Sequence, residues 1–213
     1  MQQVLVRRRV PAPAVAVATL LLLLVTLLAP VTAQAAPAVP ATPDLPEQIE
    51  AYSSYQGGTV CDPVDRPGAR QLAALIRRTY GADEVIGIAR NACYTTSEHN
   101  DGRALDWMND ASSKADRAKV SAFLDWLLAP DQYGNTHAMA RRLGVMYVIW
   151  NRRIWKSYTQ GWSDYTGSVP HTDHVHISLS VDGASGRTSY WTGRPLAGPC
   201  TPSFVADPAP AVV

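Results

Sequence analysis

Three stretches of the chain carry apolar residues at the three- and four-residue spacing of one helix face. The first begins at Pro67 and ends at Gly81, residue types that favour a helix start and a helix stop. The second begins after Ser113, a suitable N-cap, and ends before Pro130. The same spacing predicts a third, short helix from about 136 to 143.

Four short runs favour β-strands instead. They cover 85–89, 103–108, 146–150 and 174–180, and they are β-branched, aromatic or alternating in polarity. The strands and helices do not alternate as regular βαβ units. The pattern therefore predicts an α+β fold.

The beginning of the chain has the features of an export signal. Arg7, Arg8 and Arg9 precede an uncharged apolar stretch, and the small residues Ala33 and Ala35 form a small-x-small site that suits a signal peptidase. We expect a signal peptide at 1–35 that is removed. An uncleaved membrane anchor is the alternative, because the apolar stretch is long enough to span a bilayer.

Composition indicates one globular domain after the signal. The chain has 213 residues, of which 46% are apolar and 17% charged. We expect a proline-rich linker at 36–47, the domain at 48–200 and a proline-rich tail at 201–213. Removing the three signal arginines leaves 16 of the 19 Lys and Arg, against 18 Asp and Glu. This balance argues against nucleic-acid binding, and we expect a monomer that meets the membrane only during export.

Export would place the three cysteines in an oxidising compartment, where two of them can form a disulfide. We favour Cys61 with Cys93, a bridge from the segment before the first helix to a loop that enters the motif described next. Cys61 with Cys200 stays open as the alternative, because sequence does not decide connectivity.

Two of the five histidines lie in the last predicted strand. His174 and His176 are two residues apart, so both imidazoles share one face, while Val175 and Ile177 share the other. Two imidazoles on one face can converge on a single ion or reacting group. An HxH pair alone is weak support for a metal site.

A second polar cluster, SEHNDGRALDW, occupies residues 97–107. Gly102 permits a tight reversal, which would return the carboxylate of Asp106 to the imidazole of His99. With His176, the two clusters supply two nitrogens and one oxygen. This set suits tetrahedral zinc with the fourth position open for water, as in catalytic sites.

Both motifs resemble those of a known peptidase group. The pattern SxHxxGxAxD at 97–106, followed later by DHVH at 173–176, resembles the zinc peptidases of the D-alanyl-D-alanine carboxypeptidase and hedgehog fold, which include peptidoglycan endopeptidases and phage endolysins. More narrowly, residues 61–180 resemble a family of exported actinobacterial-type proteins that usually bear only a domain name. The resemblance implies a small antiparallel sheet that carries the zinc site, with helices packed against it.

The resemblance also assigns roles to single residues. It implies that His99, Asp106 and His176 bind zinc and that His174 polarises the substrate carbonyl or stabilises the oxyanion. Arg90 matches an arginine that meets the substrate carbonyl or carboxylate, with a surface arginine as the other interpretation.

The general base is the point at which this chain departs from the carboxypeptidases. They have Glu three residues before the last zinc histidine, where this chain has the shorter Asp173. Asp173 is then either the base or an acceptor that orients an imidazole. In related endopeptidases with HxH a histidine is the base, so His174 is the other candidate.

The remaining candidates receive structural interpretations. We expect Ser97 to bond the motif loop, Glu98 to point away from the ligands, and His171 to be a solvated loop residue. His137 is expected to be unrelated to the site. Packing is the favoured role for the aromatic residues, Tyr147 among them.

The expected function is therefore an exported zinc-dependent metallopeptidase of the cell wall. Its substrate would be a peptidoglycan stem peptide or cross-link, cut as a carboxypeptidase or an endopeptidase. The alternative is a zinc-binding, catalytically weak module that recognises wall peptide or a partner protein.

Overall fold

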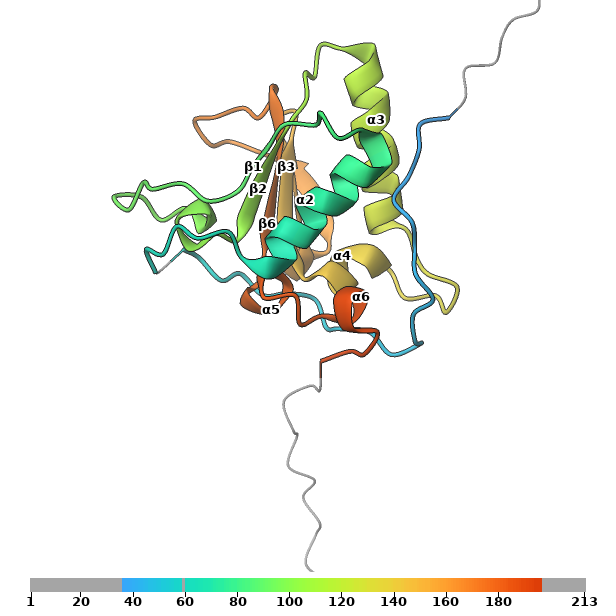
Figure 1. Cartoon of the computed structure of the whole chain (residues 1–213). Coiled ribbons are helices and arrows are strands. Elements are labelled where there is room, and N and C mark those ends of the chain that lie inside the picture. The colour runs from blue at the N-terminus through green and yellow to red at the C-terminus, as the bar shows by residue number, and fades with distance from the viewer. Residues whose placement is uncertain (1–35, 59, 197–213) are drawn as a thin grey trace, which may run out of the picture. The chain divides into compact units, whose positions relative to one another are not determined.

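The computed structural model describes residues 36–58 and 60–196. Six strands form one antiparallel sheet in the order β1-β2-β6-β3-β4-β5 (Figure 1). The strands are β1 (Ile86–Gly87), β2 (Ala104–Met108), β3 (Val145–Trp150), β4 (Arg153–Lys156), β5 (Gly161–Asp164) and β6 (His174–Leu179). With the helices below, this is the α+β class that the pattern predicts.

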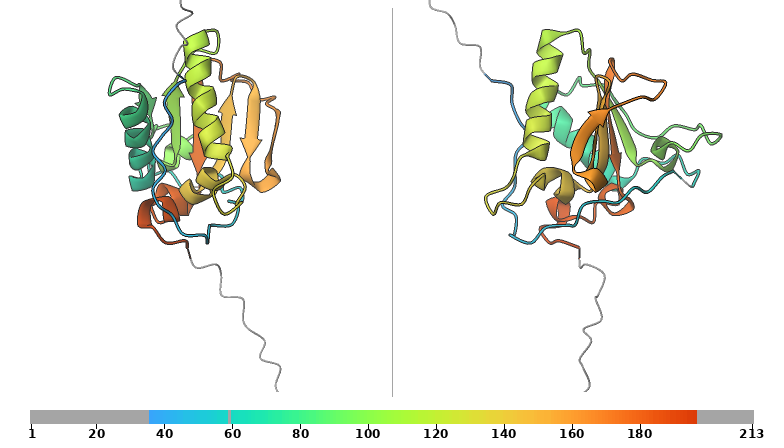
Figure 2. Two further views of the ribbon diagram at one scale, coloured as in Figure 1. Left: turned by 90° about the vertical axis from the view of Figure 1, so that its right-hand side faces the viewer. Right: turned by 180° about the vertical axis from the view of Figure 1, so that it is seen from behind.

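Helices cover one face of this sheet. Figure 2 shows α2 (Pro67–Tyr80) and α3 (Lys114–Leu128) on the same side, while the loops that precede β2 extend from the other side. The Ser113 side chain accepts a hydrogen bond from the Asp116 N–H and caps α3 as predicted. The shorter helices are α4 (Ala138–Leu143), α5 (Val181–Ala184) and α6 (Ser189–Thr192).

Strand alternation separates the core from the polar face. Leu105 and Trp107 of β2 and Val175 and Ile177 of β6 are fully buried in the hydrophobic core with α2 and α3. Phe123 of α3 contacts Trp107 edge-on, with ring centroids 5.4 Å apart. The alternate residues of β2 and β6 therefore lie on the sheet face that the two long helices leave uncovered.

Two strands were not expected from the sequence. β3 turns into β4 through Asn151 and Arg152, whose φ angles are 46° and 65°, and β5 extends the sheet at its edge. Such a two-residue turn usually shows Asn-Gly, and this chain lacks that signal.

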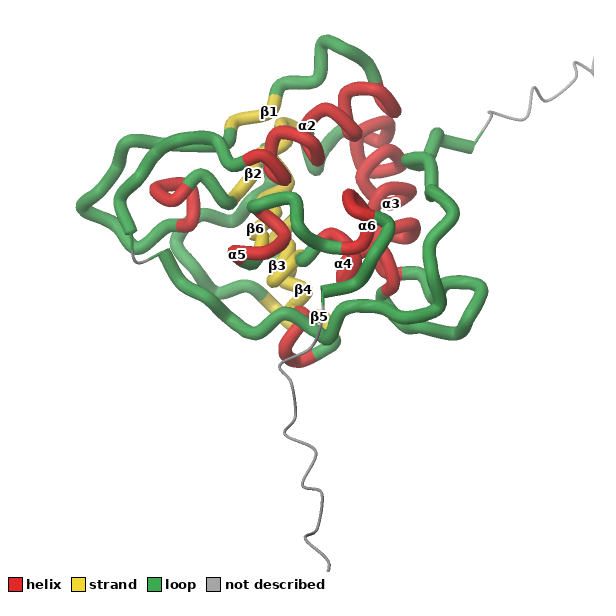
Figure 3. The backbone as a smooth tube through the Cα atoms, turned by 60° about the horizontal axis from the view of Figure 1, so that its bottom comes forward, coloured by secondary structure: helices red, strands yellow, loops and turns green. Residues whose placement is uncertain are grey.

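The segment before α2 has no regular structure, and Figure 3 shows it as a long loop beside the helices. Leu45 is 7% exposed and belongs to the core. The buried guanidinium of Arg142 donates to the carbonyls of Pro46 and Gln48. This segment is thereby tied to α4.

The predicted signal peptide at 1–35, the tail at 201–213 and Cys200 lie outside the described residues. Within the described ranges, no helix combines the length and the apolar character needed to cross a membrane.

Candidate metal centre

A short 3-10 helix, η1 (Glu98–Asp101), carries the first candidate ligand. Ser97 caps it by accepting a hydrogen bond from the His99 N–H at 3.3 Å, which confirms the structural role expected for Ser97. Gly102 ends it with φ 66° and lies so close to Val64 that a Cβ would come within 1.8 Å of the Val64 carbonyl oxygen. The chain therefore reverses at Gly102 as predicted, and β2 returns past His99.

The sheet supplies the other two candidate ligands. Asp106 on β2 is paired directly with His176 on β6. Asp106 Oδ1 lies 3.1 Å from His99 Nε2 and 3.0 Å from His176 Nδ1, and the two ring nitrogens are 3.3 Å apart. The three residues are close enough to hold a metal ion.

The chemistry of these three atoms fits a cation. His99 Nδ1 faces the carbonyl oxygen of Ile88, which only accepts, so the neutral ring carries its proton there and turns the Nε2 lone pair to Asp106. His176 Nε2 can donate to Ser178 Oγ at 3.0 Å, which leaves its Nδ1 lone pair for the same point. Tetrahedral zinc with bonds of about 2.0–2.1 Å would hold its ligand atoms about 3.3 Å apart, close to the spacing found.

The electrostatics of the centre favour an ionised Asp106 carboxylate beside a neutral His176 ring. Burial acts to raise the pKa of Asp106, but its side-chain contacts with His176 and His99 outweigh burial and hold that pKa far below its usual range. Burial lowers the pKa of His176, against the opposing effect of Asp106. An ionised carboxylate and a neutral imidazole are the forms in which Asp106 and His176 would bind a metal.

His174, Asp173 and Arg90 surround this centre. His174 Nε2 is 3.5 Å from Asp106 Oδ1, and its Nδ1 is 2.8 Å from Asp173 Oδ1. The side chain of Asp173 is 75% exposed, and the hydrogen bond from His174 lowers its pKa. The guanidinium of Arg90 contacts Asp106 Oδ2 and is 56% exposed. The structure thus brings all the predicted site residues together.

His171 corrects one expectation. It is 7% exposed rather than solvated, and its ring centroid lies 4.7 Å from that of His174 and 5.7 Å from that of His176. Burial, together with the neighbouring His176 and His174, lowers the pKa of His171 to about 4. His171 lies in the loop that precedes β6, outside any strand or helix. No periodic pattern in the sequence therefore indicates that it is buried.

Glu98 corrects a second expectation. It is 3% exposed and lines the same cavity as the histidines instead of pointing away. The reason is that Glu98 lies on a helical turn, not on an extended segment where neighbours alternate. Its Oε2 accepts a hydrogen bond from the Tyr147 hydroxyl at 2.7 Å.

The centre opens onto a cavity of about 690 Å³. Arg90, His171, His174, Tyr147 and Tyr165 contribute to its walls, and so does the loop at 94–97. A cavity of this size accepts a ligand as large as a short peptide. His137 is not part of this lining; its ring packs on Trp155, with centroids 5.3 Å apart.

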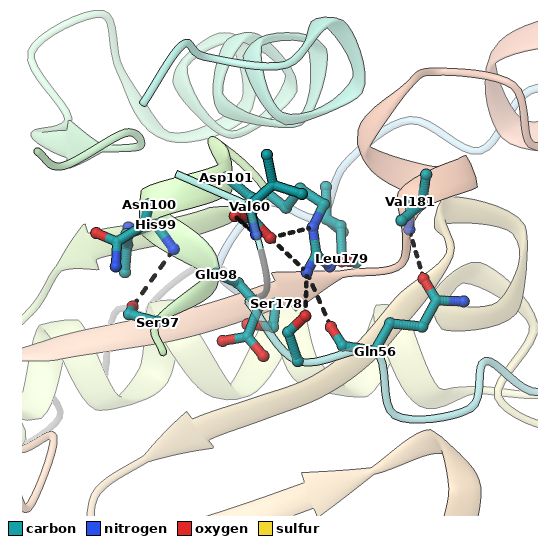
Figure 4. A network of polar contacts seen from close by, with 12 residues as sticks. Gln56, Val60, Ser97, Glu98, His99, Asn100, Asp101, Ser178, Leu179 and Val181 are labelled. Carbon is teal, nitrogen blue, oxygen red and sulfur yellow. Dashed lines mark hydrogen bonds and ion pairs between the residues drawn. The ribbon is translucent and has the colours of Figure 1, made fainter. Parts of the chain in front are cut away.

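A second polar network, centred on Arg103, contacts the motif at 97–107 (Figure 4). The buried guanidinium of Arg103 pairs with Asp101 and donates to the carbonyls of Leu179, Gln56 and Gly57. It connects the η1 turn, the end of β6 and the N-terminal segment. Apart from the polar character of the motif, no pattern in the sequence predicts this network.

The Cys61–Cys93 disulfide predicted from sequence is present, with the Cα atoms 5.5 Å apart. Cys61 is thus not available to Cys200. The bridge fastens the loop between β1 and η1, which borders the cavity, to the segment before α2.

Fold and geometry together define an α+β protein with a candidate His-Asp-His metal centre. The model of the family VldE, C-terminal domain, matches residues 63–176, more than half of the chain, and the chain belongs to this family. The match includes all three candidate ligands. No curated protein and no solved structure matches the chain.

Proposed function

We propose that this protein is an exported, zinc-dependent peptidase related to the D-alanyl-D-alanine carboxypeptidase and hedgehog group. The observation that carries the proposal is the convergence of the His99, Asp106 and His176 ligand atoms beside an open cavity that the two histidines line. Two nitrogens and one carboxylate oxygen are a catalytic zinc set. A purely structural site would be closed by a fourth protein ligand.

When bound, zinc supplies a Lewis acid and lowers the pKa of the water that it polarises from about 15.7 toward 7. The protein would contribute groups that hold and move protons beside that position. No covalent nucleophile is required, because water would be the attacking group. Ser97 has the structural role of accepting the His99 N–H.

His174 is the proposed general base. Because the Asp173 carboxylate accepts, His174 Nδ1–H donates to it, and the Nε2 lone pair is left on the cavity side next to Asp106. Asp173 then has the role of orienting His174, as its exposed position supports. Once protonated, His174 would stabilise the oxyanion that develops on the scissile carbonyl.

Arg90 is the proposed substrate-binding cation. It contacts Asp106 through one nitrogen and is exposed to the cavity, so its other N–H groups can donate to a substrate carbonyl or carboxylate. The same contact places the Arg90 guanidinium against Oδ2 of a proposed metal ligand. Loss of Arg90 would therefore affect both substrate binding and the metal ligand.

The proposed substrate is a peptidoglycan stem peptide or cross-link. The support is the motif resemblance, the export features of the sequence and a disulfide, a bond typical of exported proteins. The proposed location is outside the cytoplasm, in association with the cell wall. We propose that the protein acts as a monomer.

The test is a digest of purified wall peptides followed by mass analysis. We expect cleavage that stops on chelation, returns with zinc, and is reduced at least about 100-fold in His174→Ala. The matched control is His137→Ala, a histidine outside the cavity. Unchanged peptides at high protein concentration, with zinc bound, would refute the peptidase.

The alternative is a zinc-binding recognition module without significant turnover. The observation in its favour is Asp173, which is 75% exposed and turned to His174 where carboxypeptidases place a glutamate base. In that case wall peptides would bind in a zinc-dependent way and be recovered intact.

A further inference from the structure

The orientation of the His176 ring requires an explanation beyond the strand that carries it. Strand geometry fixes where the Cβ of His176 lies, but the ring can still rotate about its side-chain bonds. Only one rotation directs Nδ1 at Asp106 and His99. The contacts of the ring therefore decide how well the centre is formed.

Tyr147 provides the stacked contact on the face of this ring. It lies on β3, opposite Ser178, and its ring stacks on that of His176, with centroids 5.5 Å apart and an interplanar angle of 19°. On the ring edge, His176 Nε2 meets Ser178 Oγ at 3.0 Å. Tyr147 and Ser178 together limit the ring to the rotation that is observed.

Glu98 in turn holds Tyr147. Its Oε2 accepts the Tyr147 hydroxyl hydrogen at 2.7 Å, and Glu98 directly precedes the ligand His99. The bond thus joins strand β3 to the turn that carries another ligand. One end of this hydrogen bond is therefore next to His99 in the chain, and the other belongs to the ring that stacks on His176.

The second oxygen of Glu98 is the unusual part of this arrangement. Oε1 is buried and has no hydrogen-bond partner among the described residues. Glu98 also forms no salt bridge with the described part of the chain, since the neighbouring Arg103 pairs with Asp101. A buried carboxylate without a full set of partners destabilises the fold. A negative charge at this point would instead favour a cation held by His176 and His99.

We propose that Glu98 and Tyr147 are positioning residues that orient His176 and thereby set the metal affinity of the centre. The inference rests on the proposed metal site but not on peptidase activity. Glu98 acts through charge and through its hold on Tyr147, and Tyr147 acts through ring stacking.

Two conservative variants separate the charge of Glu98 from its hydrogen bond to Tyr147. Glu98→Gln keeps the size and an oxygen that can accept the Tyr147 hydroxyl, but removes the charge. Tyr147→Phe keeps the stacking ring and removes the hydrogen bond. Tyr158→Phe is the matched control, a tyrosine outside the cavity lining whose hydroxyl has no bond to Glu98 in the structure.

The measurement is zinc affinity by competition with a chromophoric chelator, on the whole mature protein. We expect about 10- to 100-fold weaker binding in each of the first two variants, and no change in Tyr158→Phe. With Co²⁺ as a probe, the visible absorption spectrum should change in Tyr147→Phe, because a rotated imidazole alters the ligand geometry. A purely structural role would instead lower the melting temperature of the metal-free protein and leave the affinity of the folded protein unchanged.

Wild-type zinc affinity in both variants would overturn the proposal, and so would a wild-type protein that binds no metal. Because affinity is the readout, the outcome is separate from that of the peptide digest. Weakened zinc binding in the variants of a protein that cuts no peptide would support the positioning pair and refute the peptidase.

Discussion

Asp106 and His176 face each other directly across β2 and β6, with Oδ1 and Nδ1 3.0 Å apart. The pairing register alone brings these two side chains together on one sheet face. A slip of one residue would send one of them into the core. Two of the three candidate ligands are therefore positioned by paired strands of the sheet. Only His99 comes from outside the sheet, from η1.

Replacing the carboxylate should abolish metal binding. We expect Asp106→Asn to lose zinc at stoichiometric concentrations, because the amide is a poor ligand and leaves two imidazoles without a negative partner. Metal analysis after gel filtration measures this. Asp164→Asn, with a 91% exposed carboxylate, is the control that should retain zinc. Normal zinc content in Asp106→Asn would refute the ligand assignment.

Removing the disulfide should destabilise the domain. The bridge spans 32 residues, for which chain-entropy arguments give a stabilisation of about 3–4 kcal/mol. We expect the double variant Cys61→Ser, Cys93→Ser to melt roughly 10 °C lower. Addition of a reductant should lower the melting temperature of the wild type and leave the variant unchanged. Equal melting temperatures of the wild type and the double variant would show that the disulfide does not stabilise the domain.

Gly102 should be far less tolerant of substitution than a glycine in open space. Gly102→Ala has both an unfavourable φ and a Cβ that meets the Val64 carbonyl. Gly134→Ala has a similarly positive φ of 81° but no atom within 4 Å of its Cβ, which isolates the effect of the close approach. We expect a loss of about 1 kcal/mol for Gly134→Ala and of more than about 3 kcal/mol for Gly102→Ala. Urea unfolding measures both values.

Tyr80 should make the fold sensitive to alkali. Burial, with a smaller contribution from Glu84, raises the pKa of Tyr80 from 10.0 to about 12. The stabilisation from keeping this phenol neutral is fully present below about pH 10 and declines as the pH rises toward 12. Tyr80→Phe keeps the ring that stacks on Trp107 and removes the titrating group.

Urea unfolding at about pH 9 and about pH 11.5 tests this prediction. The wild type should lose more stability between the two values than Tyr80→Phe does. The same loss in both proteins would assign the alkaline sensitivity to other groups.

The sequence predicts the centre well because its geometry is local or periodic. The HxH spacing places His174 and His176 on one face, and Gly102 marks the reversal that returns Asp106 to His99. Both inferences need only the repeat of a strand and the freedom of a glycine.

The surroundings of the centre depend on long-range register and could not be predicted. Tyr147 lies opposite Ser178 because the pairing of β3 with β6 shifts between Val145 and Tyr147. A bulge of this kind leaves no mark in the polarity pattern. The contacts of Glu98 with Tyr147 and of His171 with His174 and His176 likewise depend on how the turn and the loop fold onto the sheet, which the sequence pattern does not predict.

The hold of Arg142 on the carbonyls of Pro46 and Gln48 sets a practical limit on how far the chain can be shortened. A protein that started at the first residue of α2 would lack Leu45 and expose the core residues that Leu45 covers. The buried guanidinium of Arg142 would also lose two of its hydrogen-bond acceptors. Soluble expression should therefore favour chains that begin at about residue 37, even though nothing before residue 63 belongs to the family match.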